Sequence, residues 1–457
     1  MSVFTSQERR TAISLSLVYA TRMMGLFLLL PVISILGQDL SGATPLLIGL
    51  AVGVYGLCQA VLQIPFGALS DRFGRKPVIL AGIAVFIVGS IIAAMADTIW
   101  GVIAGRALQG GGAISAVIMA LAADLTRDSQ RTKVMAVIGV SIGLSFILSI
   151  ILGPALMTRF SLSGIFYCIA GLGCFAAFLV LFVVPTPDKL YRDRDISVVG
   201  RDLPGLLSNK ELLRLDAGIL ILHLLITASF VSIPLRLLEL GLSIDVHWKV
   251  YLLAALGSLV IVIPLVGLSE RKLSLRVVMM AGIGGLALAE FAIGFVGNTE
   301  WMIIASLLCF FGFLSVLEAL LPSLVSRIAP AASRGTAMGV YSTSQFFGAF
   351  LGGVLGGWMV GTLGLAQVHV GLGILCLLWI PLVYHLQSPP RWHNRRLRLG
   401  DRSNQASQSN SGREELRRNL LAIPGVAEVV FVPGDPEAYL KVDRHRVDEQ
   451  ALLEYSS

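Results

Sequence analysis

Charged residues are scarce in this sequence. Asp, Glu, Lys and Arg together make up 14% of its 457 residues, whereas hydrophobic residues make up 55%. Soluble domains carry roughly 25% charged residues, so the composition excludes a water-soluble enzyme and a disordered scaffold. Long apolar runs account for most of the chain, and a membrane span needs ~20 apolar residues. The chain therefore has room for about a dozen spans plus a tail.

Paired cysteines are also lacking. The sequence has five cysteines, all in apolar stretches, and none forms a CxxC pair. An odd number with aliphatic neighbours argues against a disulfide framework and against a thiolate metal site. We therefore expect no metal site.

Signatures of soluble catalysis are missing as well. The sequence has no HExxH, no GxSxG and no Walker A pattern, so we predict that the protein is not an enzyme and is not driven directly by ATP. Its net charge is +7, but in a membrane protein the placement of charge matters more than its total. We expect the lipid bilayer to be a partner. We expect no nucleic acid partner and no cofactor.

The sequence has instead a series of continuous apolar runs. Continuous runs favour helices over the alternating strands of a membrane barrel, so we predict an all-α membrane protein. Twelve spans are the simplest count, and an even count places both termini on one side. The predicted spans are residues 11–36, 46–69, 77–96, 100–123, 134–157, 164–184, 216–239, 249–268, 275–297, 301–325, 336–361 and 366–387.

Lysine and arginine mark one side of these spans. The opposite loops are short and hold few basic residues. The positive-inside rule makes the basic side cytoplasmic, and we therefore expect both termini in the cytoplasm. The basic loops include Arg72, Arg75 and Lys76, then Arg127, Arg131 and Lys133, and then Arg271, Lys272 and Arg276.

Two copies of one pattern indicate two halves. The run from Ile64 to Arg72 corresponds at a constant offset to the run from Ile263 to Arg271, and each copy closes the second span of its half. Duplicated halves are usual in secondary transporters. We predict a six-helix half over 1–184, a cytoplasmic linker over 185–215, a second six-helix half over 216–388 and a tail over 389–457.

The loop between the second and third spans carries the most specific motif. Gly67 lets another helix approach, Asp71 lies just beyond a helix end, and Arg75 can hold a carboxylate such as Asp124. The run GALSDRFGRK over 67–76 resembles the signature cytoplasmic loop of the major facilitator superfamily. The resemblance implies two six-helix halves and a latch that holds the outward-open state; the alternative is a basic loop that only sets topology. The expected latch comprises Gly67, Asp71, Arg72, Arg75 and Asp124.

The same resemblance bears on the eleventh span. Small residues repeat there every four positions and make a flat helix face. In the family this helix packs against the second span near Gly67, so we expect a close contact there. The repeat consists of Gly348, Gly352 and Gly356, with Gly353 and Gly357 alongside.

The fourth span resembles the drug/proton antiporter group of that superfamily. Its motif is RALQGGGA over 106–113, and the resemblance implies a proton-relay role for Arg106. The alternative is a structural arginine capped by carbonyl groups, because an arginine inside a membrane is costly unless it is paired or wet. The fifth-span motif of the group is only partly present, since Ser149 and Met157 depart from it around Gly153-Pro154.

An ionisable residue inside a span is a functional hypothesis. His223 and Glu318 lie at similar depths, about two turns from the cytoplasmic ends of their helices, and family architecture places both on the central cavity. A coupled carboxylate–imidazole pair can bind and release a proton. We expect Glu318 to carry the transported proton and His223 to tune it; the alternative is a structural hydrogen bond.

Further candidates lie in other spans. Arg22, near the middle of the first span, suits an anionic substrate group or a carboxylate partner. Tyr19, Tyr55 and Tyr341 are candidates for the substrate cavity, with helix packing as the alternative. For Glu290, in the ninth span, we expect a snorkelling or a structural role.

The sequence of the tail predicts a separate small domain. Its pattern predicts the order β-α-β-β-α, like a ferredoxin-like domain. Metal-carrying relatives of that shape use a CxxC motif, which the tail lacks, so we expect a regulatory or docking role rather than soft-metal transfer. The alternative is a passive appendage.

These observations converge on transport. We predict a proton-coupled secondary active transporter, an efflux antiporter of small organic compounds that works by alternating access. The resemblance implies a bacterial inner membrane, and we expect a monomer. The alternative is a membrane sensor on a transporter scaffold, with the tail domain as its output.

Overall fold

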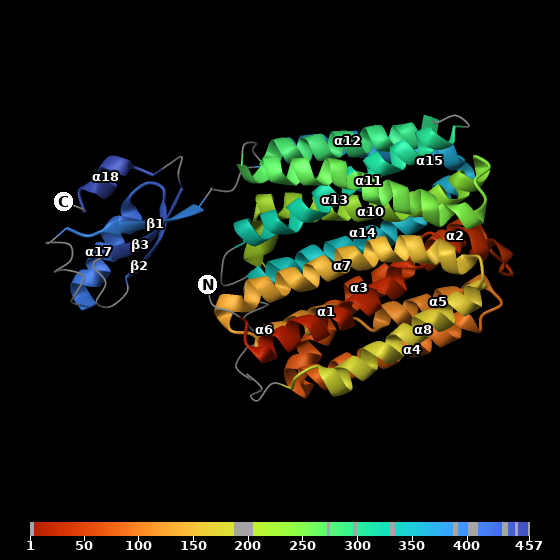
Figure 1. Ribbon diagram of the computed structural model, residues 1–457, viewed down its shortest axis with the longest axis horizontal. Helices are drawn as coiled ribbons and strands as arrows, with labels where there is room; N and C mark the ends of the chain where they lie inside the picture. Colours follow the sequence, from red (N-terminus) through yellow and green to blue (C-terminus); the bar gives the residue numbers. More distant parts are fainter. Residues whose placement is uncertain are drawn as a thin grey trace. The chain divides into compact units, whose positions relative to one another are not determined.

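The computed structural model describes residues 4–186, 204–271, 275–295, 299–329, 334–386, 392–400, 410–431, 437–443 and 447–455. The chain divides into two compact units, Met1–Gln387 and Ser388–Ser457. The first unit is a bundle of helices, and the second is a small mixed domain (Figure 1).

The bundle follows the order of the expected spans. The first half contains α1 (Ser6–Phe27), α2 (Ile33–Leu36), the 3₁₀ turn η1 (Gly37–Asp39), α3 (Pro45–Phe73), α4 (Arg75–Ala94), α5 (Ile99–Gly111), α6 (Ser115–Asp124), α7 (Asp128–Met157), α8 (Leu162–Phe178) and the π-helical turn η2 (Leu179–Val183). The second half contains α10 (Lys210–Glu239), α11 (Ile244–Arg271), α12 (Leu275–Phe295), α13 (Glu300–Ile328), α14 (Arg334–Thr362) and α15 (Leu365–Tyr384).

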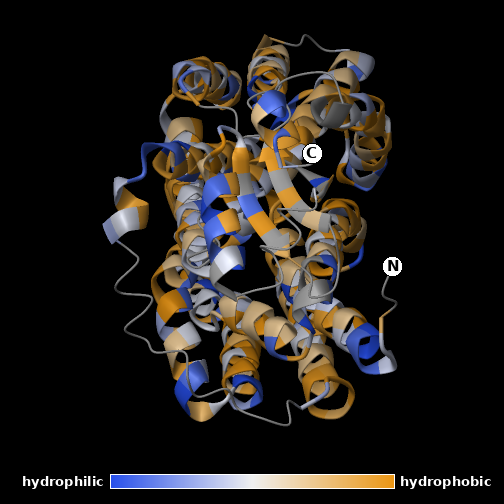
Figure 2. Ribbon diagram, turned by 90° about the vertical axis from the view of Figure 1, so that its left-hand side faces the viewer, coloured by the Kyte–Doolittle hydropathy of each residue, from blue (hydrophilic) through white to orange (hydrophobic). Residues whose placement is uncertain are grey.

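Within the described residues, ten helices are long and apolar enough to cross a membrane, with α5 and α6 counted as one. Two further long helices, α1 and α14, fall outside that set. Helix α1 carries charged residues such as Arg22, and α14 is rich in glycine and polar residues. Viewed end on, the helices are largely hydrophobic (Figure 2), as expected for segments that contact lipid.

Two predicted spans are not continuous helices. The first breaks between α1 and α2, where Leu28–Val32 forms turns around Pro31, because proline cannot continue the hydrogen-bond ladder. The fourth breaks between α5 and α6 at Gly112. A Cβ added there would lie 2.2 Å from the carbonyl oxygen of Gly82, so the break lets the chain approach α4.

The two ends of the bundle differ in packing. We call the end with the α3–α4 turn and Asp124 the basic end, and the other the opposite end. At the opposite end α3 and α14 touch along their backbones. A Cβ added at Gly49 would lie 2.1 Å from Gly353 O, and one added at Gly357 would lie 2.4 Å from Pro45 O.

Toward the basic end the same two helices diverge. A Cβ added at Gly67 of α3 or at Gly339 of α14 would meet no atom of the described residues within 4 Å. The close approach expected at Gly67 is therefore absent from this conformation, since the two helices meet near Gly49 and Gly53 instead. The bundle is closed at the opposite end and open between the halves at the basic end.

The glycine repeat of α14 packs on α10 rather than on α3. Added Cβ atoms at Gly348 and Gly352 would lie 2.2 and 2.3 Å from the carbonyl oxygens of Leu220 and Leu224. The neighbouring Gly353 and Gly357 face α3. Helix α14 thus uses two small faces, one for its own half and one for the other half.

The second unit has the element order β1 (Trp392–Arg398), α17 (Asn410–Ala422), β2 (Val426–Phe431), β3 (Glu437–Asp443) and α18 (Glu449–Leu453). The strands form one antiparallel sheet in the order β1–β3–β2. Leu397, Leu420, Val429 and Leu440 are among its buried core residues. The order β-α-β-β-α expected from the sequence is present.

Candidate functional site

Ionised side chains meet at the α3–α4 turn. Gly74 has φ +92°, a conformation that favours glycine, and it is the N-cap of α4. Arg75 follows it and lies 2.5 Å from Asp71 Oδ1 and 3.0 Å from Asp124 Oδ2. Its Nη1 also donates to Ser70 Oγ at 2.6 Å, a partner that the sequence analysis missed. The turn is therefore tied to the end of α6.

The other two expected latch residues stand apart from this cluster. Arg72 is exposed and its guanidinium lies 5.4 Å from the ring centroid of Phe73. Gly67 faces open space, as described above. In this conformation the Arg75 cluster joins elements of the first half only.

The second half brings together the expected proton-coupling pair. His223 Nδ1 of α10 lies 3.4 Å from Glu318 Oε1 of α13. The amide nitrogen of Gln345, on α14, lies 2.8 Å from His223 Nε2. The Glu318 side chain is 36% exposed, and its Oε1 has no hydrogen-bond partner. Part of this carboxyl group is therefore accessible to solvent, but Oε1 itself is buried.

Two more groups belong near this pair. Tyr341 of α14 is buried and lies within electrostatic range of Glu318 and Asp216. Asp216 is 9% exposed on α10 and precedes His223 by seven residues, a spacing that places both on one helix face. Asp216 was not predicted from the sequence, because it lies at the edge of the predicted span.

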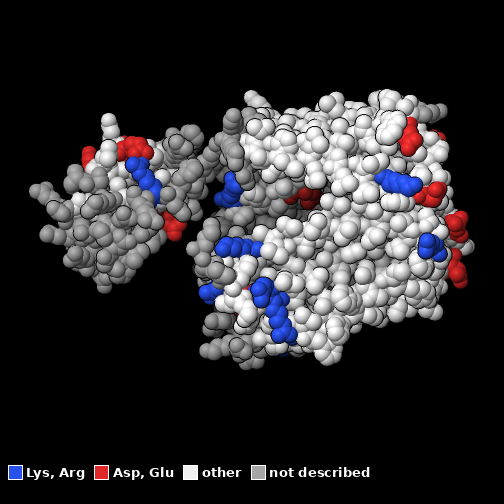
Figure 3. Space-filling view, in the orientation of Figure 1, with Lys and Arg blue, Asp and Glu red and all other residues white. Residues whose placement is uncertain are grey.

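The surface of the bundle has a hollow on the face drawn in Figure 3. The face in Figure 3 is hollowed toward the left, and acidic side-chain atoms lie within the hollow. The hollow lies toward the basic end, where added Cβ atoms at Gly67 and Gly339 would meet no described residue.

Arg106 is enclosed by the first half. It is 1% exposed; its Nε donates to Ala51 O at 3.2 Å and its Nη2 to Val52 O at 3.4 Å. Its Nη1 donates to Gln109 Oε1 at 2.8 Å, and the ring centroid of Tyr55 lies 4.9 Å away. These contacts match the alternative of an arginine capped by carbonyl groups. They also place the 1% exposed Tyr55 in helix packing.

Arg22 has far fewer contacts. It is 4% exposed on α1, and its Nη2 donates to Gln59 Oε1 at 2.9 Å. Gln59 in turn donates to Ser115 Oγ at 3.1 Å, and the half-buried Tyr19 also interacts with Ser115. A polar cluster from α1, α3 and α6 thus surrounds one face of Arg22.

A buried network that the sequence analysis missed joins α10, α12 and α15. Glu290 and His369 are both fully buried, with Glu290 Oε2 2.7 Å from His369 Nδ1. Ser229 donates to Glu290 Oε1 at 2.6 Å, and Ser232 Oγ lies 3.0 Å from His369 Nε2. Glu290 therefore does not snorkel, because its partners lie inside the bundle; the structural role remains.

Aromatic rings close the centre of the bundle across the two halves. The ring centroid of Phe146, on α7, lies 5.1 Å from that of Phe27 and 6.0 Å from that of Phe230 on α10. It also lies 6.5 Å from that of Phe311 on α13. These rings join the two halves beyond the polar clusters, toward the closed opposite end.

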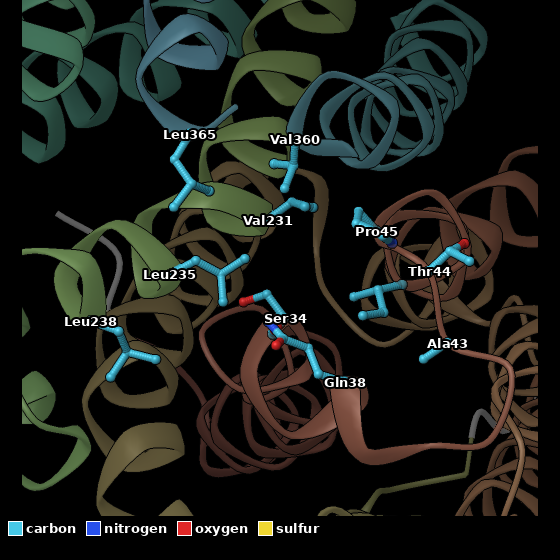
Figure 4. A pocket seen from close by; sticks show the side chains of 11 residues that line it. Ser34, Gln38, Ala43, Thr44, Pro45, Val231, Leu235, Leu238, Val360 and Leu365 are labelled. Atoms are coloured by element: carbon cyan, nitrogen blue, oxygen red, sulfur yellow. The ribbon is translucent and has the colours of Figure 1, made fainter. Parts of the chain in front are cut away.

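A pocket of about 540 Å³ lies at the opposite end, between the halves. Its walls are mostly apolar, and Ser34 and Gln38 point into it (Figure 4). Ser34 Oγ has no hydrogen-bond partner. The remaining walls come from α3, α10, α14 and the start of α15.

The fold and these sites define a multi-pass membrane transporter built from helical halves that part at one end. A model of the Major Facilitator Superfamily matches residues 15–259 and 215–432. The chain belongs to this superfamily.

Individual relatives agree with this assignment. The chain is 41% identical over 439 residues to the inner membrane transport protein YajR of Escherichia coli (strain K12), covering 96% of this chain and 95% of the relative. It is 29% identical over 344 residues to the multidrug resistance protein MdtH of Yersinia pestis (strain Pestoides F), covering 74% and 84%. Among solved structures, a D-xylose–proton symporter matches with a TM-score of 0.70 and 14% identity, covering 84% and 99%. The chain is therefore a transporter and not an enzyme.

Proposed function

We propose that this chain is a proton-coupled transporter of small organic compounds. The observation that carries the proposal is the cluster of His223, Glu318 and Gln345 on three helices of the second half. Glu318 is the part-exposed carboxylate with an unpartnered oxygen, and such a group inside a membrane protein suits a proton relay. Glu318 carries the proton, and His223 and Asp216 adjust its release.

Alternating access follows from the two ends of the bundle. With the basic end and both termini in the cytoplasm, the described conformation is open to the cytoplasm and closed to the outside. Opening outward requires α3 and α14 to separate near Gly49 and Gly353 and the Phe146 contacts to part. The halves then close at the basic end, where Gly67 leaves room for α14.

The Arg75 cluster is the proposed latch for that outward-open state. Asp71 is 34% exposed, so it can interact with the other half when the basic end closes. Arg75 holds Asp71 and Asp124 in place within the first half. In this proposal the Arg75 cluster is one part of the latch and a contact across the halves completes it; Arg72 contributes charge at the same surface.

Export by antiport is the proposed direction. The name of the relative MdtH refers to multidrug resistance, and the fourth-span motif resembles that of drug/proton antiporters. The substrate cavity includes Arg22, Tyr19 and Tyr341. The protein works in a bacterial inner membrane as a monomer, uses the proton gradient, and has no nucleic acid partner.

The second unit motivates a second candidate function. It forms a compact unit of its own, and its β1–β3–β2 sheet with two helices suits a ferredoxin-like domain over 389–457. A transporter-like sensor would use this domain as its output. Removal of residues 391–457 with no effect on transport or on signalling under stress would leave the domain as a passive appendage.

A pH-gradient assay tests the main proposal. Purified chain in liposomes should move a fluorescent organic compound when a pH gradient is imposed, and Glu318→Gln should abolish the gradient-driven part. Glu300→Gln is the matched control, since Glu300 begins α13 and is exposed. Full gradient-driven transport by Glu318→Gln would remove Glu318 from the proton path.

A further inference from the structure

The first half holds a buried cation whose donors are mostly unused. Arg22 is 4% exposed, and its Nη2 bonds to Gln59 Oε1. Its Nε and Nη1 have no hydrogen-bond partner. Among the residues that the structure describes, no carboxylate forms an ion pair with Arg22. The position therefore has a positive charge and free donors, but no anion.

Such a position is costly in a membrane protein. A guanidinium does not lose its proton in proteins, and a charge inside the bilayer needs a partner or water. Gln59 supplies no negative charge, and its own amide nitrogen is engaged with Ser115 Oγ. An anion bound beside Arg22 would offset the free-energy cost of burying its unpaired charge.

Arg106 shows what a satisfied arginine in the same half looks like. Its three nitrogens bond to Ala51 O, Val52 O and Gln109 Oε1. The fold can therefore satisfy a buried guanidinium with its own groups, and it does so for Arg106 on α5. Arg22 and Arg106 are both buried, yet Arg22 keeps two nitrogens without a partner whereas Arg106 does not. Burial of an arginine in this half therefore does not by itself leave its donors free.

We infer that Arg22 binds an oxyanion, the carboxylate or phosphate of a transported compound with an apolar body. This inference rests on the proposed function and specifies its substrate class. A charge-assisted hydrogen bond to an oxyanion is roughly twice as strong as a neutral one. The ring of Phe86, 5.8 Å from the guanidinium carbon, belongs to the buried core, so the half-buried Tyr19 is the aromatic side chain that we expect to contact the apolar body. A lipid headgroup carries the same oxyanion, and the test separates the two sources.

Ligand-induced stabilisation measures the binding directly. The full chain in neutral detergent is titrated with benzoate, benzyl alcohol or benzylammonium, which share one ring and differ in charge. Benzoate should raise the melting temperature saturably, and the other two should not. Arg22→Gln should weaken the apparent benzoate affinity by about tenfold or more. Arg22→Lys should retain part of the affinity, because it keeps the charge and loses the planar donors.

Arg9→Gln is the matched control. Arg9 lies on the same helix but is exposed, so the variant removes the same charge and should bind benzoate like the wild type. Equal benzoate affinity in Arg22→Gln and wild type would overturn the inference. So would a wild type stabilised by neither benzoate nor inorganic phosphate. If Arg22→Gln does not fold, Arg22→Lys decides, and an unchanged affinity in that variant would also overturn it.

Two further measurements distinguish a lipid ligand from a transported compound, and distinguish failure of this inference from failure of the proposed function. Stabilisation by phosphatidylglycerol nanodiscs that depends on Arg22, with no response to benzoate, would contradict a substrate site. Binding of benzoate that depends on Arg22 without proton release would support the oxyanion site and count against proton coupling. Proton release evoked equally by all three compounds, in Arg22→Gln as in wild type, would support coupling and refute the oxyanion site.

Discussion

The two halves of the bundle carry charged side chains of different kinds within their spans. Inside the described spans, the first half holds the cations Arg22 and Arg106. The second half holds the carboxyl groups of Asp216, Glu290 and Glu318, two of them beside histidines. A carboxylate can gain and lose a proton, whereas a guanidinium cannot. This comparison is the ground for our proposal that the second half exchanges protons and that the first half recognises charge.

Each half also contains one satisfied group and one unsatisfied group. Each guanidinium nitrogen of Arg106 and each carboxyl oxygen of Glu290 has a hydrogen-bond partner. Arg22 and Glu318 keep atoms without a partner. Fully partnered buried polar groups hold helices together, while unpartnered ones are suited to ligands or protons. This difference in hydrogen bonding is our ground for proposing that Arg106 and Glu290 are structural and that Arg22 and Glu318 belong to functional sites.

Breaking the satisfied pair of the second half should have the largest effect on stability. Glu290→Gln or His369→Gln leaves one partner buried without its counterpart, which costs about 3–5 kcal/mol. Thermal unfolding of the two single variants and the double variant measures this cost. The double variant should lose less than the sum of the singles. Strictly additive losses would show that the two side chains act independently.

The two buried arginines should respond oppositely to neutralisation. Arg106→Gln removes hydrogen bonds that carbonyl groups then lack, at a cost of about 1–3 kcal/mol. Arg22→Gln removes a charge that has no counterion and should change stability by less than about 0.5 kcal/mol, or increase it. Melting curves without ligand compare the two variants. A larger loss of stability in Arg22→Gln than in Arg106→Gln would contradict the distinction between a structural Arg106 and a ligand-binding Arg22.

The smallest expected effect concerns the start of α1. Arg127 donates hydrogen bonds to Glu8 at 2.8 Å and lowers the pKa of that carboxyl group from 4.5 to about 2. A lowered folded-state pKa adds stability above the ordinary pKa, and this stability is lost as pH falls toward the folded value. Wild type should therefore melt above Glu8→Gln at pH 7, with a gap that narrows below about pH 4.5. A gap that does not depend on pH would rule out the ionic contribution.

The sequence predicted the parts of the site that local pattern determines. The motif spacing brought Arg75 toward Asp124, and the matched depths of His223 and Glu318 predicted a pair that the structure places 3.4 Å apart. Hydropathy located the helices because each must cover a span of apolar length.

Other features depend on which face each helix presents, and this is set by packing. His369 was missed because nothing along α15 shows that it faces Glu290 on α12. The break at Leu28–Val32 lies inside an apolar run, so hydropathy did not reveal it. Gly67 was expected at a helix contact, but the glycine contacts of α3 lie nearer its start. Which end of the bundle is closed is a property of one conformation, and sequence pattern does not encode it.

The most direct test of the account is proton release by the purified chain. Candidate compounds are added to wild type and to Glu318→Gln in weakly buffered detergent solution, and the pH change is recorded. We expect proton release from wild type and no release above background from the variant, because the variant lacks the carboxyl group that would give up the proton. Equal release from both proteins would contradict the account and place the proton site elsewhere.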